Sequence, residues 1–266
     1  MSPHLQDLFS ECKSILDFNA SDSLRNRKTT TGEDRVATEK FFIAIAGNIG
    51  TGKTTLAQMI SSRLGWVPHF EPVGENPYLG DFYKDMERWA FPLQIYFLTH
   101  RFKAHRKITD GGQSAVQDRS IYEDANVFAR NLFEQGMMAP RDYRNYLSLY
   151  ECMCQSLSPP DLVVYLKKSL PELKRGIAKR NRDFESEIPD QYLLNLNRYY
   201  DEWVDGYSLG KKLVIECDSL DYVGRPADFD QVTQKILENI VQHDFLFNTP
   251  IPRTLSSADI DERLKF

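Results

Sequence analysis

The segment GNIGTGKT, residues 47–54, has the spacing G-x-x-x-x-G-K-[ST] of a phosphate-binding loop. Its glycines let successive backbone N–H groups point at phosphate oxygens, and the start of a following helix adds positive potential. Lys53 supplies a cation for the β- and γ-phosphates, and Thr54 offers a hydroxyl to Mg²⁺. The motif predicts a nucleoside triphosphate site with Mg²⁺, whose nucleotide-binding residues are Asn48, Gly50, Thr51, Gly52, Lys53, Thr54 and Thr55.

Two other short segments carry groups suited to phosphoryl transfer. In EPVGENPY, residues 71–78, Glu71 is suited to accept the proton of a substrate hydroxyl. In DRSIYED, residues 118–124, Asp118 is suited to bind Mg²⁺ and Arg119 to stabilise charge on the transferred phosphoryl group. Ser120 and Glu123 also fit the capping box S-x-x-E, so this stretch taken alone equally describes a solvated first helical turn.

A basic segment, LKRGIAKRNRDFE, occupies residues 173–185. One interpretation is a solvated helix end. The other is a closing lid whose arginines neutralise the triphosphate and exclude water.

The whole chain has the composition of a globular protein. It has 266 residues and a formal net charge of −5, with a pI of about 5.6. The acidic balance argues against a nucleic-acid polymer as partner, and the sequence contains no apolar run of the roughly 20 residues that cross a bilayer. We expect a polar, mobile extension over residues 1–40, a kinase domain over 41–248 and a tail over 249–266. Acidic residues near the N-terminus disfavour a transit peptide, so a cytoplasmic location is expected.

The positions of the apolar runs predict an α/β fold. Strands are expected at 41–46, 66–70, 114–117, 162–166 and 212–217. Helical patterns separate them, which is typical of a parallel sheet covered on both faces. In such sheets ligands bind beyond the carboxyl ends of the strands. The phosphate loop, Glu71 and Asp118 each follow a different expected strand, so they should meet at one edge.

Taken together, these segments resemble the deoxyribonucleoside kinases. The motifs AGNIGTGKTT, EPV, ERWAFPLQIYF, DRSIYEDA and KRNRDFE occur in the order and spacing of that family, over about residues 41–240. The resemblance is closest to the bacterial deoxyadenosine/deoxyguanosine kinase branch. It implies a P-loop kinase fold with a lid, a doubly wound five-stranded sheet of order 2-3-1-4-5, and a homodimer.

The resemblance also assigns roles by motif. It implies that Glu71 is the general base, that Asp118 helps to place Mg²⁺, and that Arg119 lies beside the reacting oxygens. Binding of the deoxynucleoside would fall to Phe82, Tyr83, Gln94, Phe97, Arg101, Asp124, Phe128 and Glu185. Gln94, Arg101 and Asp124 would read the base, Phe128 would stack on it, and Tyr83 and Glu185 would hold the 3′-hydroxyl. Arg180 and Arg182 match lid arginines that contact ATP.

Helical periodicity agrees with this assignment. Gln94, Phe97 and Arg101 fall at i, i+3 and i+7, and share one helix face. Asp124 and Phe128 are four residues apart and share another. An ordinary buried stripe is the simpler interpretation of the first helix, but an unpaired buried arginine would be costly there.

One position departs from the family pattern. Gly176 stands where the family usually has the first of three lid arginines, so Arg175 or Lys179 substitutes for it or two arginines suffice.

We therefore expect transfer of the γ-phosphoryl group of ATP to the 5′-hydroxyl of a deoxynucleoside. Deoxyadenosine ranks first, then deoxyguanosine and deoxycytidine. The alternatives are a nucleoside monophosphate kinase and a non-catalytic nucleotide-binding subunit on the same fold. The presence of both Lys53 and Glu71 disfavours the second of these.

Overall fold

Five parallel strands form the centre of the molecule in the order β2-β3-β1-β4-β5. The computed structural model describes residues 40–70, 76–182, 185 and 188–245, with side chains described as far as residue 240. The strands are β1 (Phe42–Gly47), β2 (Val67–His69), β3 (Ala115–Asp118), β4 (Leu162–Lys167) and β5 (Lys211–Glu216). Each agrees with its expected run to within one residue at either end. The doubly wound sheet and its strand order are confirmed.

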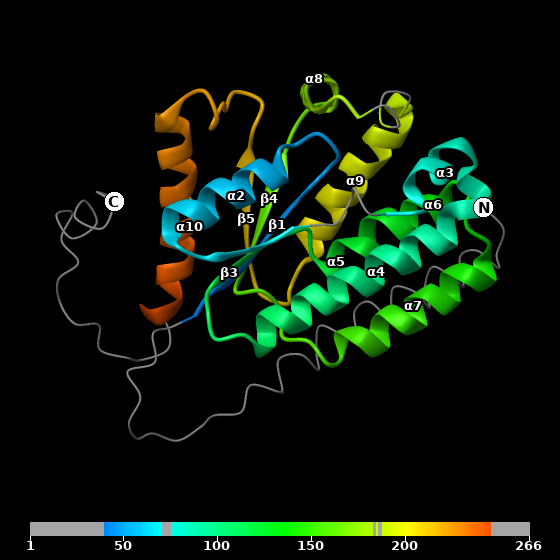
Figure 1. Ribbon diagram of the computed structural model, residues 1–266, viewed down its shortest axis with the longest axis horizontal. Coiled ribbons are helices and arrows are strands. Elements are labelled where there is room, and N and C mark those ends of the chain that lie inside the picture. The colour runs from blue at the N-terminus through cyan, green and yellow to red at the C-terminus, as the bar shows by residue number, and fades with distance from the viewer. Residues whose placement is uncertain (1–39, 71–75, 183–184, 186–187, 246–266) are drawn as a thin grey trace.

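Helices connect successive strands and return the chain to the same edge of the sheet (Figure 1). The helical segments are α2 (Lys53–Leu64), α3 (Leu79–Lys84), α4 (Met86–Asp110), α5 (Ile121–Glu123), η2 (Asp124–Ala129), α6 (Arg130–Glu134), α7 (Pro140–Cys154), α8 (Leu170–Arg180), α9 (Asp190–Gly206) and α10 (Pro226–Phe245). Parallel strands can be joined only by crossover connections, and helices supply them here.

The alternation of side chains along the strands builds a separate core on each face of the sheet. In β4, Val164 packs with α2 and α10, whereas Val163 and Tyr165 pack with the α4–α7 and α9 side. Figure 1 shows α2 and α10 on one side of the sheet, and α4, α7 and α9 on the other. Because helices cover both faces, all but one end residue of β1 and of β4 is buried, as their continuous apolar runs predict.

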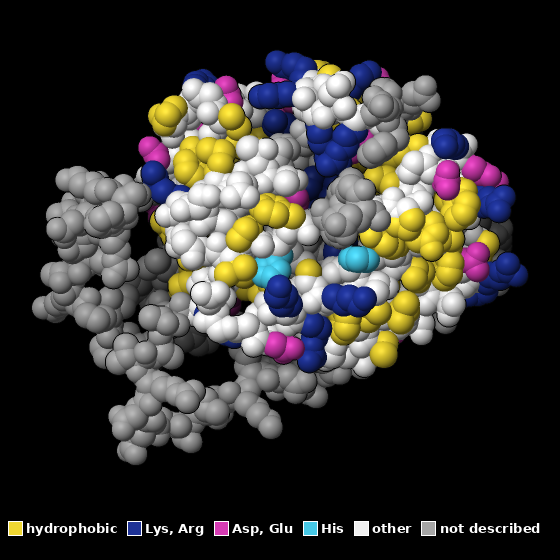
Figure 2. Space-filling view, viewed as in Figure 1, with side chains coloured by type: hydrophobic (Ala, Val, Ile, Leu, Met, Phe, Trp, Pro, Cys, Tyr) yellow, Lys and Arg dark blue, Asp and Glu magenta, His cyan; other side chains and the backbone are white. Residues whose placement is uncertain are grey.

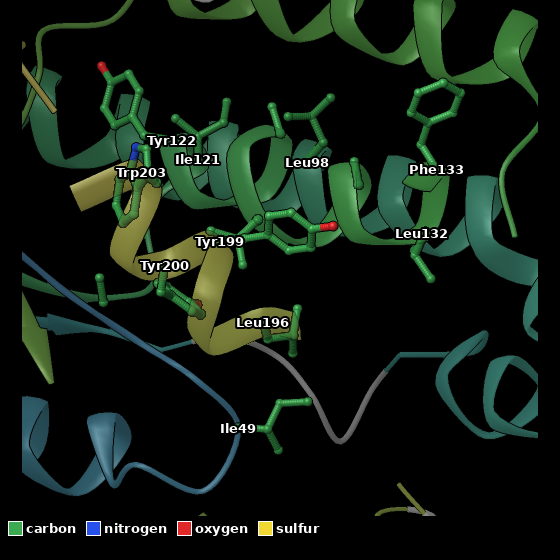
Figure 3. Close-up of a cluster of buried hydrophobic side chains, with 14 of the residues drawn as sticks. Ile49, Leu98, Ile121, Tyr122, Leu132, Phe133, Leu196, Tyr199, Tyr200 and Trp203 are labelled. Carbon is green, nitrogen blue, oxygen red and sulfur yellow. The ribbon is translucent and has the colours of Figure 1, made fainter. Parts of the chain in front are cut away.

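The larger core lies between α9 and the segment that runs from α4 to α7. Figure 3 shows Tyr199, Tyr200 and Trp203 of α9 close to side chains from α4, α5 and α6. Aromatic rings contribute to this core: Tyr200 of α9 stacks on Tyr165 of β4 at 5.5 Å and meets Phe128 of η2 edge-on at 6.1 Å. This packing fixes α9 against the residues that follow β3.

Several expectations concern the ends of the chain. Residues 1–39 and 246–266, which include almost all of the expected N-terminal extension and the whole expected tail, lie outside the described residues. The domain boundaries at 40 and 248 therefore stay predictions. Within the part of the chain that the structure describes, no helix is long and apolar enough to cross a membrane.

Candidate active site

A cavity of about 440 Å³ opens at the edge of the sheet where the strands end. The parts of the chain that converge on it include the phosphate loop, α3, the middle of α4, the residues after β3, and the C-terminal half of α8. Sixteen of the expected site residues line it: Gly50, Gly52, Lys53, Thr54, Thr55, Phe82, Tyr83, Gln94, Phe97, Arg101, Asp118, Arg119, Phe128, Arg180, Arg182 and Glu185. One cavity thus combines phosphate-binding chemistry with the expected base-reading side chains.

Three other expected residues lie behind the cavity wall. Asn48 and Thr51 are buried within the phosphate loop, and Asp124 contacts Arg101 from behind. Glu71, the expected general base, lies outside the described residues, as do 72–75.

Asn48 anchors the phosphate loop to the rest of the domain. Its side-chain amide donates to the Leu193 carbonyl at 2.9 Å and to Asn197 Oδ1 at 2.7 Å, while its Oδ1 accepts from Ile49 N at 2.7 Å. Asn197 in turn donates to the Lys168 carbonyl at 2.9 Å. The loop is therefore tied to α9 and to the end of β4, so its backbone donors are oriented before a ligand binds.

Lys53 lies within the loop and is 6% exposed. Its Nζ donates to the Asn48 carbonyl at 2.6 Å and to Thr51 Oγ1 at 3.3 Å. Burial, and then the cationic Arg119 nearby, lower the pKa of Lys53 to about 7, although Asp118 and Glu123 oppose this shift. Bound phosphate would supply the negative charge that favours the protonated ammonium.

Asp118 and Thr54 lie together beside the phosphate loop. The Thr54 hydroxyl donates to Asp118 Oδ2 at 2.5 Å. Asp118 Oδ1 is buried and has no hydrogen-bond partner among the described residues. An uncompensated buried carboxylate oxygen next to a threonine hydroxyl is a donor set that fits Mg²⁺.

Arg119 has an uncommon backbone conformation, with φ at +69°. Its backbone N–H donates to the Ile45 carbonyl of β1 at 3.0 Å. Its guanidinium lies over the Phe128 ring at 4.5 Å and donates to the Tyr200 hydroxyl at 2.7 Å. The strained backbone turns the chain at the end of β3 and directs this side chain into the cavity.

A buried ion pair forms the far wall of the cavity. Arg101 contacts Asp124, and its guanidinium also lies over the Phe97 ring at 4.9 Å. Two helical turns before Arg101, Gln94 is 3% exposed, and its Oε1 has no hydrogen-bond partner among the described residues. The wall therefore presents an amide and a guanidinium that Asp124 holds from behind, which suits a planar polar ring.

The segment after the β3 turn differs in detail from the expected α-helix. Residues Asp124–Ala129 form a π-helix, η2, between two short α-helical pieces. Asp124 and Phe128 still serve the same wall of the site, one through Arg101 and the other beneath Arg119. A π-helical turn inserted in a helix is often associated with a functional site.

Glu185 joins the lid to the substrate end of the cavity. Its carboxylate lies 3.3 Å from Arg180 Nε and accepts from Arg182 Nη1 at 3.1 Å. Burial, and then neighbouring Tyr192 and Glu185, raise the pKa of Tyr83. The two groups expected at the 3′-hydroxyl are thus close to each other, and Tyr83 is neutral at physiological pH.

Sequence reasoning missed part of the wall. Tyr192, Lys168 and the residues 220–223 also line the cavity. The 220–223 segment directly follows β5, so the rule that ligands bind beyond strand ends could have found it. Tyr222 donates to the Gly52 carbonyl at 3.1 Å, and it thereby covers the phosphate loop from the side opposite α9.

Comparison with known proteins places this geometry in a family. The profile of the family described as deoxynucleoside kinase matches residues 43–242. The chain belongs to the deoxynucleoside kinase family. The predicted activity, phosphoryl transfer from a nucleotide donor to a deoxynucleoside, is confirmed at this level, and with it the P-loop kinase fold.

Individual relatives give the same result. A Bacillus subtilis deoxyadenosine/deoxycytidine kinase is 36% identical over 76% of this chain and 93% of its own length. A Dictyostelium discoideum deoxyadenosine kinase is 42% identical over 62% of this chain and 67% of its own. A solved structure of deoxyadenosine kinase from M. mycoides has a TM-score of 0.67 and 31% identity, and covers 74% of this chain and 99% of that one.

Gly176 stands where the family usually has the first lid arginine, and in this deoxynucleoside kinase the glycine has a steric explanation. A Cβ at Gly176 would lie 2.0 Å from the Gly50 carbonyl oxygen, so α8 rests directly on the phosphate loop. Arg175 points away from the cavity and pairs with Glu172, whereas Lys179 lines the cavity. Figure 2 shows Lys and Arg side chains gathered around α8. Of the two candidate substitutes for the missing arginine, the geometry favours Lys179.

We predict that Gly176→Ala lowers kcat/KM for ATP by about 10²-fold, because the added methyl displaces α8 and its arginines from the phosphate loop. Helix propensity alone would give the opposite expectation, a stabilisation of up to about 1 kcal/mol. Steady-state kinetics and thermal unfolding distinguish the two. Gly206→Ala is the matched control, since a Cβ there meets nothing within 4 Å. A more stable Gly176→Ala enzyme with normal ATP kinetics would contradict the prediction.

Proposed function

We propose that the protein transfers the γ-phosphoryl group of ATP to the 5′-hydroxyl of deoxynucleosides in the presence of Mg²⁺, with deoxyadenosine preferred, then deoxyguanosine and then deoxycytidine. The proposal rests chiefly on one feature: the Gln94 amide and the Arg101 guanidinium, which Asp124 holds from behind, line the same cavity as the phosphate loop.

The base preference follows from hydrogen-bonding chemistry. The Gln94 amide can donate to one ring nitrogen or carbonyl and accept from an exocyclic amino group. Asp124 offers only acceptors, and it favours adenine and cytosine, which carry an amino group where thymine and guanine have a carbonyl oxygen. Relatives named for deoxyadenosine and deoxycytidine support this selection, and the place of deoxyguanosine rests on the relatives named for it.

Each charged group at the phosphate end has a proposed role. Lys53 and the loop N–H groups bind the β- and γ-phosphates, and Arg119 stabilises charge on the transferred group. Thr54 and Asp118 hold Mg²⁺, which when bound neutralises phosphate charge and orients the β- and γ-oxygens. Arg180, Arg182 and Lys179 close over the triphosphate and exclude water. Glu71 accepts the 5′-hydroxyl proton, a role supported by the EPV motif.

Kinase assays with ATP and Mg²⁺ test this proposal. We expect phosphorylation of deoxyadenosine with the highest kcat/KM, lower values for deoxyguanosine and deoxycytidine, and the lowest for thymidine. The four deoxynucleoside 5′-monophosphates are the comparison substrates, because a monophosphate kinase would use them instead. Activity on monophosphates alone, or a preference for thymidine, would contradict the proposal.

The lowered pKa of Lys53 predicts that ATP binding weakens as pH rises. Below pH 7 the free enzyme already carries a protonated Lys53, so titration of this group does not change the affinity for ATP. Above pH 7 the free lysine is neutral, and ATP binding must take up one proton. The Kd for ATP·Mg²⁺ should therefore rise by up to about tenfold per pH unit between pH 7 and 9.

Isothermal titration at pH 8 in two buffers of different ionisation enthalpy measures this proton uptake directly. Lys53→Arg keeps a cation throughout the range, so it should abolish the uptake even if it binds ATP less tightly. A wild-type enzyme that binds ATP without proton uptake at pH 8 would rule out the role of Lys53 titration.

We also propose that the enzyme is a homodimer, as its resemblance to the family implies. Half-buried apolar side chains on α4, among them Phe91, Ile95 and Phe102, support an apolar contact surface. Figure 2 shows hydrophobic side chains gathered over this part of the molecule. Sedimentation equilibrium should give twice the chain mass of 30.8 kDa, and a monomer at micromolar concentration would contradict the proposal. The cytoplasmic location stays a prediction.

A further inference from the structure

Glu123 has surroundings that a helix-capping role does not explain. One carboxylate oxygen accepts from the Ser120 backbone N–H at 2.7 Å, which is the expected half of the capping box. The other oxygen accepts from the Tyr200 hydroxyl at 2.5 Å and lies 3.5 Å from Arg119 Nη1. A capping glutamate normally lies at the surface, whereas this side chain is 0% exposed. Burial of a carboxylate costs free energy unless a positive charge and hydrogen-bond donors compensate it.

Tyr200 connects Glu123 to Arg119 through a single hydroxyl. The guanidinium can only donate and the carboxylate can only accept, so the direction of both hydrogen bonds is fixed. Arg119 donates to Tyr200 at 2.7 Å, and Tyr200 donates to Glu123. The tyrosine comes from α9, far along the chain, and its ring stacks on Tyr165 with an interplanar angle of 11°. Figure 3 shows it within the aromatic core that fixes α9.

These contacts hold the Arg119 guanidinium in one orientation. Phe128 lies under its face, Tyr200 takes one N–H, and the Glu123 charge lies behind it. Catalytic charge stabilisation depends on groups that are oriented before the reaction, because reorientation during the reaction costs free energy. A long arginine side chain on a strained turn needs such support to keep one position.

We propose that Glu123 and Tyr200 are positioning residues, which hold the Arg119 guanidinium toward the transferred phosphoryl group through an Arg–Tyr–Glu hydrogen-bond chain. This inference rests on the proposed role of Arg119. It accounts for the burial of a glutamate that neither the phosphate loop nor the base-reading wall requires.

Tyr200→Phe tests the chain most directly, because it removes the hydroxyl and keeps the ring that stacks on Tyr165. We expect kcat to fall by about tenfold or more, the scale of a lost hydrogen bond to a charged group. KM for ATP and for the deoxynucleoside should stay within about threefold, since the lost interaction acts in the transition state. Tyr207→Phe is the matched control: it also lies on the α9 side of the core and its buried hydroxyl has no partner among the described residues. It should leave kcat unchanged.

Glu123→Gln is a second variant of nearly equal shape. The amide has one acceptor oxygen where the carboxylate has two, and it carries no charge behind Arg119. With that oxygen accepting from the Ser120 N–H, the NH2 faces the Tyr200 hydroxyl and leaves its proton without an acceptor, so kcat should fall as in Tyr200→Phe. Circular dichroism and thermal unfolding verify that both variants fold.

A double-mutant cycle with Arg119→Ala separates this inference from the role of Arg119. The losses should be strongly non-additive: once Arg119→Ala has lowered kcat, adding Tyr200→Phe should change it by less than about twofold. Two outcomes would refute the Arg–Tyr–Glu hydrogen-bond chain and leave the role of Arg119 intact. One is additive losses of kcat. The other is a folded Tyr200→Phe enzyme with normal kcat while the Arg119→Ala enzyme is defective. A near-normal rate for Arg119→Ala would instead refute the proposed role of Arg119, and the chain with it.

Discussion

Buried charge is the constraint around which this active site is built. Among the described residues, the buried Lys, Arg, Asp and Glu side chains are Lys53, Arg101, Asp118, Arg119, Glu123, Asp124 and Glu185, and all seven lie at or directly behind one cavity. Each would be unfavourable alone, because removing an ion from water costs several kcal/mol. Arg101 with Asp124, and Arg119 with Glu123, offset that cost in pairs. Lys53 and Asp118 are less completely compensated, and they are the groups that phosphate and Mg²⁺ would satisfy.

The fold supplies the apolar surroundings that make these pairs strong and specific. The aromatic core between α9 and the segment from α4 to α7 excludes water from the back of the site. The same core fixes α9, which supplies Tyr200 behind Arg119 and Asn197 behind Asn48. One helix therefore orients both the phosphate loop and the arginine beside it. A substitution that disturbs the packing of this core would therefore lower catalytic activity even though it changes no ligand-binding residue.

Much of the site could be predicted because the relevant signals are local. The spacing of Gly47, Lys53 and Thr54 defines a loop whose backbone must turn tightly at the start of a helix. Gln94 and Arg101 share a helix face because helical geometry alone brings them together. The interpretation of Glu123 as a capping residue was correct for one oxygen, which bonds Ser120, and incomplete for the other, which lies in the core. Tyr192 was missed because a single tyrosine in a helix carries no motif, whereas Lys168 and Tyr222 follow β4 and β5 and the strand-end rule could have found them.

The sequence by itself determined the five strands and the phosphate loop, which follow from short-range spacing, and it predicted that the residues after the strands meet at one edge. Its motifs also identified the family, and that resemblance implied the strand order and the residues predicted to read the base. Only the tertiary structure decided which side chains support the reactive ones. Tyr200 is 81 residues from Arg119 along the chain, and Gly176 meets Gly50 through a close approach of two backbones. Such contacts depend on how whole helices pack against one another. Close packing sets interatomic distances to within a fraction of an ångström, and a pattern of residue types along the chain does not specify distances that finely.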